Sequence, residues 1–218
     1  ELEVMHKNFK LLRLLNLWGI QTSDCTLPSG IGNLIHLRYL GIRASNITEL
    51  PKSIGNLRNL LTLDYRNVNS DGDVTIKIPN IFGKLVLLRH LFLPVECPWC
   101  TTEDLELSAL KNLQILWGVR QDGWADWLFR ELPKLSITLE KLMIVVSTQR
   151  DLAAAFHCPS LLSGGLHTFH CELRSKIALQ LEEPISHCEQ LYKLTLTGAI
   201  QMNLALTLPP NLFMLELT

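Results

Sequence analysis

Apolar residues recur along this chain in a short pattern. A leucine is followed three residues later by a second apolar residue, and in most copies another apolar residue stands two positions further on. Nine copies are present: Leu12-Leu15-Leu17, Leu37-Leu40-Ile42, Leu60-Leu63-Tyr65, Leu88-Leu91-Leu93, Leu113-Leu116-Gly118, Leu139-Leu142-Ile144, Leu166-Phe169-Cys171, Leu191-Leu194-Leu196 and Leu212-Leu215-Leu217. Successive copies begin 21 to 28 residues apart. This spacing indicates one structural unit repeated from end to end.

Each copy predicts a short β-strand. Alternate side chains of a strand face the same side, so the second and third apolar residues of a copy point into one layer. One copy cannot bury them alone, but parallel strands stacked in register can. The period is typical of leucine-rich repeats. The predicted fold class is therefore α/β, a leucine-rich-repeat solenoid of about nine repeats, shaped as a curved horseshoe with the parallel sheet on its concave face.

A second phrase links the early copies. It reads Leu-Pro at 27–28 and 50–51, then Ile-Gly-Asn at 31–33 and 54–56, with a looser version beginning at Ile78-Pro79. Proline fixes φ and lacks an amide hydrogen, which suits the point where the strand has ended and the chain turns. We expect glycine and asparagine to permit the return turn. The phrase is thus interpreted as a packing device.

The spacing becomes less regular towards the second half of the chain. Three long connections interrupt it, at 66–77, 94–108 and 118–136, and we expect such inserts on outer faces. After about residue 118 the second phrase disappears, and the segment 150–162 is expected to form a turn or two of helix.

One domain is predicted for residues 1–218. Regular repeats are expected over about 9–94 and more irregular ones over about 95–218. Hydrophobic residues make up 47% of the chain and 46 residues are leucine, so the core is built mainly from one aliphatic shape.

Charge and hydropathy argue against nucleic acid and membranes as partners. The formal net charge is −1, so the field of the whole molecule favours neither nucleic acid nor an acidic membrane surface. No apolar run reaches the roughly 20 residues that a membrane span requires. We therefore predict no nucleic-acid partner and no membrane span.

The sequence motifs of the first half resemble those of a known family. Residues 27–67, LPSGIGNLIHLRYLGIRASNITELPKSIGNLRNLLTLDYRN, and residues 78–94, IPNIFGKLVLLRHLFLP, look like the repeat domain of plant intracellular NLR immune receptors of the coiled-coil class. The resemblance covers about 9–94, and the remainder matches only as generic repeats. Extracellular plant repeat receptors resemble one another in a stricter repeat unit that contains a G-x-I-P motif. This sequence lacks that motif.

The resemblance implies a cytoplasmic switch in which this domain is the sensor and restraint of a larger receptor. The implied partners are proteins: a pathogen effector or a guarded host protein, and the receptor's own nucleotide-binding domain. ATP or ADP is expected only in that domain, because this chain contains no G-x-x-x-x-G-K-[ST] motif. No cofactor is predicted here, and the chain is expected to be a fragment of the receptor.

Candidate contact residues follow from the strand pattern. Positions one before, one after and three after the middle apolar residue of a copy should face outward on the concave side. Aromatic residues and arginine are enriched at binding hot spots. The protein-binding candidates are Trp18, Tyr39, Arg43, Thr62, Asp64, Arg66, His90, Phe92 and Trp117, and the same positions in a later copy include Met143 and Val145. Alternatively, Trp18 and Trp117 fold onto neighbouring repeats as ordinary packing.

Other chemistry has weaker support. Cys97 and Cys100 have C-x-x-C spacing, but no second pair follows to complete a zinc site. His167 and His170 fall on a predicted strand at an offset that directs them to opposite faces. No nucleophile elbow, H-E-x-x-H motif or glycine-rich nucleotide loop occurs. We predict no catalytic or metal site.

Two further interpretations remain open. An extracellular repeat receptor or inhibitor-type ectodomain would show disulfides and a glycan at Asn46, whereas we expect the six cysteines to be reduced thiols. The third interpretation is an enzyme, which would require that this chain alone has catalytic activity.

Overall fold

The computed structural model describes eleven segments of the chain. They are residues 8–66, 76–95, 100–102, 107–120, 132–135, 138–157, 165–175, 178–181, 185–186, 188–202 and 207–218. The chain divides into two compact units, Glu1–Leu113 and Gln114–Thr218, which are described separately. The organisation as one domain stays a prediction.

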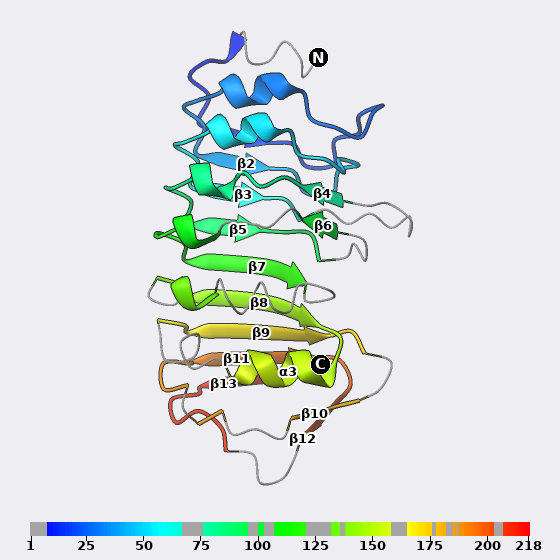
Figure 1. The fold of residues 1–218 in the computed structure, drawn as a ribbon, viewed down its shortest axis with the longest axis vertical. Helices are drawn as coiled ribbons and strands as arrows, with labels where there is room; N and C mark the ends of the chain where they lie inside the picture. The colour runs from blue at the N-terminus through cyan, green and yellow to red at the C-terminus, as the bar shows by residue number, and fades with distance from the viewer. Residues whose placement is uncertain are drawn as a thin grey trace. The chain divides into compact units, whose positions relative to one another are not determined.

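Unit 1 is built on four short parallel strands (Figure 1). They are β1 (Leu14–Asn16), β2 (Tyr39–Gly41), β3 (Thr62–Asp64) and β5 (His90–Phe92), and each pairs with the next. The register aligns Leu15, Leu40, Leu63 and Leu91, the middle residues of the first four apolar copies. In these copies the second and third apolar residues are at most 8% exposed. The predicted ladder is confirmed.

Short 3-10 helices follow the strands and return the chain to the next one. They are η1 (Ser29–Asn33), η2 (Lys52–Asn56), η3 (Phe82–Lys84) and η4 (Leu107–Ala109). Pro28 and Pro51 directly precede η1 and η2 with φ of −64° and −68°. The prolines therefore lie at the turn, as predicted. A second, two-stranded parallel sheet pairs β4 (Ile76–Ile78) with β6 (Cys100–Thr102).

The glycines of the Ile-Gly-Asn phrase have a different role from the one expected. Gly32 and Gly55 lie inside η1 and η2, and neither has the positive φ found at Gly19. A methyl group built on Gly32 would overlap the carbonyl oxygen of Ser53 and lie 2.6 Å from its Cβ. Close approach of successive helices, and not backbone freedom, is what requires glycine at position 32.

Asparagine side chains join successive turns along one edge. In unit 1 the Asn59 amide donates to the Ile35 carbonyl oxygen at 2.9 Å and the Asn112 amide donates to that of Val86 at 3.1 Å. Asn211 makes the corresponding bond to Glu189 in unit 2, at 2.8 Å. Each bond satisfies a carbonyl of the preceding repeat, so it couples neighbouring repeats directly.

Unit 2 contains five parallel strands (Figure 1). They are β7 (Ile115–Arg120), β8 (Lys141–Val146), β9 (Thr168–Leu173), β11 (Lys193–Thr197) and β13 (Met214–Leu217). The register aligns the middle residues of the last five copies: Leu116, Leu142, Phe169, Leu194 and Leu215. The unit also contains η5 (Leu132–Lys134) and a small parallel sheet of β10 (Leu179–Leu181) and β12 (Ile200–Met202).

One of these copies is shifted by a residue. Gly118 has φ of 90°, and the β7–β8 register jumps at this point, so that Val119 pairs with Ile144. Val119 is fully buried and takes the inward position that the sequence pattern assigned to Gly118. The assignment of Gly118 as a ladder residue was wrong because a bulge inserts one extra residue there.

The predicted helical segment forms α3 (Gln149–Phe156). The hydroxyl of Thr148 caps it by accepting a hydrogen bond from the Asp151 amide at 3.2 Å. Phe156 is buried with its ring edge-on to Phe169, 5.5 Å between centroids. The helix therefore covers the leucine side of the unit 2 sheet. None of the helices in the described segments is long and apolar enough to cross a membrane.

Candidate protein-binding site

The candidate site is the side of the unit 1 sheet opposite the buried leucines, called here the strand face. Backbone bonding extends the ladder beyond the strand ends, because the Gly19 amide donates to the Arg43 carbonyl at 2.9 Å and the Ala44 amide to that of Arg66 at 3.3 Å. Trp18, Arg43 and Arg66 thus occupy neighbouring places on successive repeats. The strand face consists of Leu14, Asn16, Trp18, Tyr39, Gly41, Arg43, Thr62, Asp64, Arg66, His90 and Phe92.

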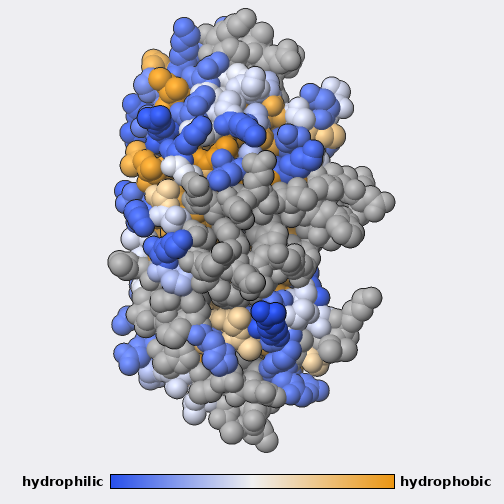
Figure 2. Space-filling model, in the orientation of Figure 1, coloured by the Kyte–Doolittle hydropathy of each residue, from blue (hydrophilic) through white to orange (hydrophobic). Residues whose placement is uncertain are grey.

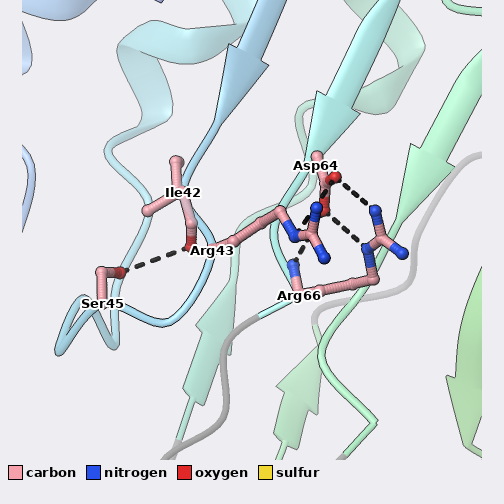
Figure 3. Close-up of polar contacts among 5 residues, drawn as sticks. All are labelled: Ile42, Arg43, Ser45, Asp64 and Arg66. Carbon is pink, nitrogen blue, oxygen red and sulfur yellow. Dashed lines mark hydrogen bonds and ion pairs between the residues drawn. The ribbon is translucent and has the colours of Figure 1, made fainter. Parts of the chain in front are cut away.

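Two arginines converge on one buried carboxylate (Figure 3). Arg66 donates to both oxygens of Asp64, from Nε to Oδ1 at 2.9 Å and from Nη2 to Oδ2 at 2.6 Å. Arg43 lies on the other side of the same carboxylate, with Nε 3.8 Å from Oδ2. The hydrogen bonds to Asp64 raise the pKa of Arg66, so that arginine is charged throughout the accessible pH range. The cluster carries a net positive charge.

Packing and a tight turn hold this cluster. The guanidinium carbon of Arg66 lies 4.4 Å from the centroid of the Phe92 ring, a cation–π geometry. In the turn after Arg43 (Figure 3), the Ser45 hydroxyl donates to the Ile42 carbonyl at 3.4 Å and accepts from the Ile47 amide at 3.3 Å. Both arginines therefore project from a well-supported backbone.

Tyr39 lies over a glycine of its own strand. A methyl group built on Gly41 would lie 2.7 Å from the Tyr39 hydroxyl oxygen and 2.9 Å from Oδ1 of Asn16. The ring thus occupies the space that a side chain at position 41 would need. The sequence offered a signal, since glycine stands at an outward position of a strand, but the strand pattern alone did not single it out.

The remaining unit 1 candidates differ in exposure. The Trp18 side chain is 75% exposed, so it does not fold onto a neighbouring repeat. Thr62 Oγ1 and His90 Nδ1 are joined at 2.9 Å, and both residues are half-buried. Asp64 is only 3% exposed, which differs from its expected place as a contact residue. Its role in this geometry is to position the two arginines.

Trp117 belongs to unit 2, on strand β7. Its ring is half-buried and edge-on to His170, 5.5 Å between centroids. Met143, the register position between them, is 2% exposed. The packing alternative thus describes Trp117 but not Trp18. Met143 and Val145 keep the register of the outward positions, but neighbouring side chains bury both, so they are not exposed as expected.

His170 and three cysteines are the described residues that bear on the weaker chemical candidates. Burial lowers the pKa of His170, and its Nε2 lies 3.1 Å from Thr197 Oγ1. Cys25, Cys171 and Cys188 are free thiols, and burial raises the pKa of Cys171 to about 12 and that of Cys188 to about 11. The Cys171 and Cys188 thiols therefore stay protonated near neutral pH. In the described segments, no group of three potential ligands is placed to hold a metal ion. Cys97 lies outside the described residues, and so does the Cys100 side chain.

A second exposed surface lies beside the turns that precede the strands. On the face drawn in Figure 2, apolar patches lie among hydrophilic side chains along the left edge of the upper part. Among the described residues of those turns, Ile35, Val86 and Leu87 are about half exposed. Ile35 and its neighbours in the turn lie off the strand face, so they supply control positions.

Comparison with known proteins agrees with this architecture. The family model described as "Leucine-rich repeat region" matches residues 2–205. A solved leucine-rich-repeat protein of Leptospira interrogans matches 96% of this chain and 67% of its own, with a TM-score of 0.51 and 20% identity. This likeness concerns the fold, and it confirms the predicted leucine-rich-repeat class.

Sequence relatives are more specific. Disease resistance protein RPP8 of Arabidopsis thaliana is 39% identical over 111 residues, which is 51% of this chain and 12% of that protein. The probable disease resistance RPP8-like protein 2 of the same plant is 35% identical over 159 residues, 67% of this chain and 17% of that protein. The chain thus spans only a small part of the length of these relatives. It belongs to the leucine-rich repeat region family and is similar, over half its length or more, to plant disease resistance proteins.

Proposed function

We propose that this chain is the protein-binding repeat domain of a plant immune receptor, acting in the cytoplasm and without catalysis. It senses a pathogen effector, directly or through a guarded host protein, and restrains the receptor's nucleotide-binding domain. The similarity to disease resistance proteins supports the receptor role. The observation that carries the binding role is the exposed Trp18 beside Arg43, because aromatic and arginine side chains dominate binding energy at protein interfaces.

Trp18→Ala in the full-length receptor tests this assignment. We expect it to weaken co-purification with the nucleotide-binding domain or the recognised protein, or to cause activity without a pathogen, because a buried interface tryptophan contributes about 2 kcal/mol or more. Ile35→Ala is the matched control, since it also removes an exposed apolar side chain from unit 1 but lies off the strand face. Identical behaviour of the two variants in both assays would contradict the proposal.

The extracellular alternative makes a separate prediction at Asn46. Its side-chain nitrogen, the atom that would carry a glycan, donates to the Thr22 carbonyl at 2.6 Å and contacts Cys25 Sγ at 3.4 Å. Its oxygen accepts from the Thr22 amide at 2.9 Å. We therefore expect the chain, secreted from plant cells with an added signal sequence, to show no mass loss at Asn46 on enzymatic deglycosylation. A glycan at that residue would favour the ectodomain interpretation.

A further inference from the structure

On the strand face, the Arg43 guanidinium has N–H donors that the chain's own contacts do not use. Among the described residues its side chain has one ionic partner, Asp64, at 3.8 Å, which is too long for a hydrogen bond. The side chain is 49% exposed. A guanidinium has five N–H donors in a fixed fork, so Arg43 presents an unused set of donors to the solvent.

The net charge of Arg43, Asp64 and Arg66 indicates which kind of group would bind at Arg43. Asp64 already accepts two hydrogen bonds from the Arg66 guanidinium and one from the Arg66 amide, and it is the sole acidic residue among the strand-face positions defined above. Two arginines and one carboxylate leave one positive charge. A single negative charge at Arg43 would neutralise it, whereas a doubly charged group would leave one excess negative charge beside the Asp64 carboxylate. A side-chain carboxylate fits better than a phosphate.

The geometry reduces the cost of binding such a group. Arg66 holds the Asp64 carboxylate by two hydrogen bonds and itself lies over Phe92, so the carboxylate that attracts Arg43 is already in place. Asp64 orients the Arg43 side chain before a partner binds, so less side-chain conformational entropy is lost on binding. A bidentate arginine–carboxylate pair is also among the stronger polar contacts.

An apolar anchor lies beside this arginine. Trp18 takes the equivalent position on the preceding repeat, and neighbouring strands are about 4.8 Å apart. Its indole ring is largely exposed. An extended segment lying across the sheet would therefore meet the indole and the guanidinium with residues that are adjacent or nearly so.

We propose that Arg43 and Trp18 form a two-part docking site for a protein segment that carries an acidic side chain beside an apolar one. The carboxylate pairs with the Arg43 guanidinium, and the apolar side chain lies on the Trp18 ring. This proposal rests on the proposed protein-binding function and adds the chemistry of the partner.

A peptide library of random sequence, displayed on phage and selected against the full chain, tests the chemistry. We expect enriched peptides to carry Asp or Glu next to Leu, Ile or Phe. Selection against the Arg43→Gln chain should lose the acidic preference and keep the apolar one. Enrichment of basic or uncharged peptides, the same acidic enrichment on Arg43→Gln, or no enrichment on the unmodified chain would each overturn the proposal.

The affinity of one selected peptide for the unmodified chain and its variants, measured by fluorescence anisotropy, tests the roles of Arg43 and Trp18 separately. Arg43→Gln should weaken binding at least about tenfold, since it removes hydrogen bonds made by a charged group. Arg43→Lys should recover part of the loss, because it keeps the charge without the fork. Arg58→Gln is the matched control: it removes the same charge from an exposed position in a turn of unit 1, and should leave the affinity unchanged.

Outcomes that affect only one of the two proposals can be recognised. Loss of binding in Trp18→Ala with none in Arg43→Gln would overturn the carboxylate site but leave the strand face as the binding surface. Unchanged binding in both variants would contradict the assigned face as well. Tighter binding of a phosphoserine version of the peptide than of the glutamate version would show that the site takes a dianion, against the charge argument.

Discussion

Leu63→Ala is expected to lower the free energy of unfolding by about 2–5 kcal/mol. Leu63 is fully buried and lies in register between Leu40 of β2 and Leu91 of β5, which are also fully buried. Truncation removes contacts with both neighbouring repeats at once and leaves a cavity that short strands fixed in register cannot close easily. Urea unfolding followed by circular dichroism measures the effect as a shift of the midpoint.

Leu14→Ala is the matched control for this prediction. Leu14 has the same side chain and also lies in a ladder strand, but it points to the strand face and is 61% exposed. We expect its effect to stay within about 0.5 kcal/mol, as is usual for exposed substitutions. Equal shifts of the urea midpoint for Leu63→Ala and Leu14→Ala would contradict the assignment of inward and outward positions.

The second large effect is expected at Gly32. Gly32→Ala should destabilise the chain by about 1–3 kcal/mol, because the new methyl group overlaps the Ser53 backbone and forces two successive 3-10 helices apart. The cost cannot be relieved by a side-chain rotation, since the atom in the way is a carbonyl oxygen. Thermal unfolding and urea unfolding both measure it.

Gly55→Ala is the control at the same place in the next repeat. Its new methyl group would lie 3.1 Å from Cδ of Lys84, the outer part of a flexible side chain, and 3.6 Å from Cβ of Ile81, an ordinary contact. Lys84 can move, so we expect Gly55→Ala to be neutral or to stabilise by up to about 1 kcal/mol through the unfolded state. If Gly32→Ala proves as stable as Gly55→Ala, the close-approach explanation fails.

The strands could be predicted from the sequence because their signal is local and repeated. Within each unit the middle apolar residues, Leu15 to Leu91 in unit 1 and Leu116 to Leu215 in unit 2, lie in register, since a period-two pattern can bury only one face of a strand. The bulge at Gly118 could not be predicted in the same way. It depends on a backbone conformation that the apolar spacing does not encode, and it moves Val119 to the buried side.

The site could be predicted only as a set of positions. Which side chains lie exposed there depends on contacts between repeats. Asp64 is buried because Arg66 folds back onto it, and Trp117 is half-covered because His170 reaches it from two strands away. Neither contact follows from the alternation of residues within one strand. The roles of the nine candidate residues in binding a partner stay predictions.

The placement of Tyr39 over Gly41 has a consequence for natural variation in this gene. Any replacement at position 41 introduces an atom where the tyrosine ring and the Asn16 side chain now lie, so the ring would have to swing outward. A polymorphism at Gly41 would therefore act on the strand face through the side chain two residues away. Alleles that differ only at this position should be compared by the surface that Tyr39 presents, and not by the chemistry of the substituted residue.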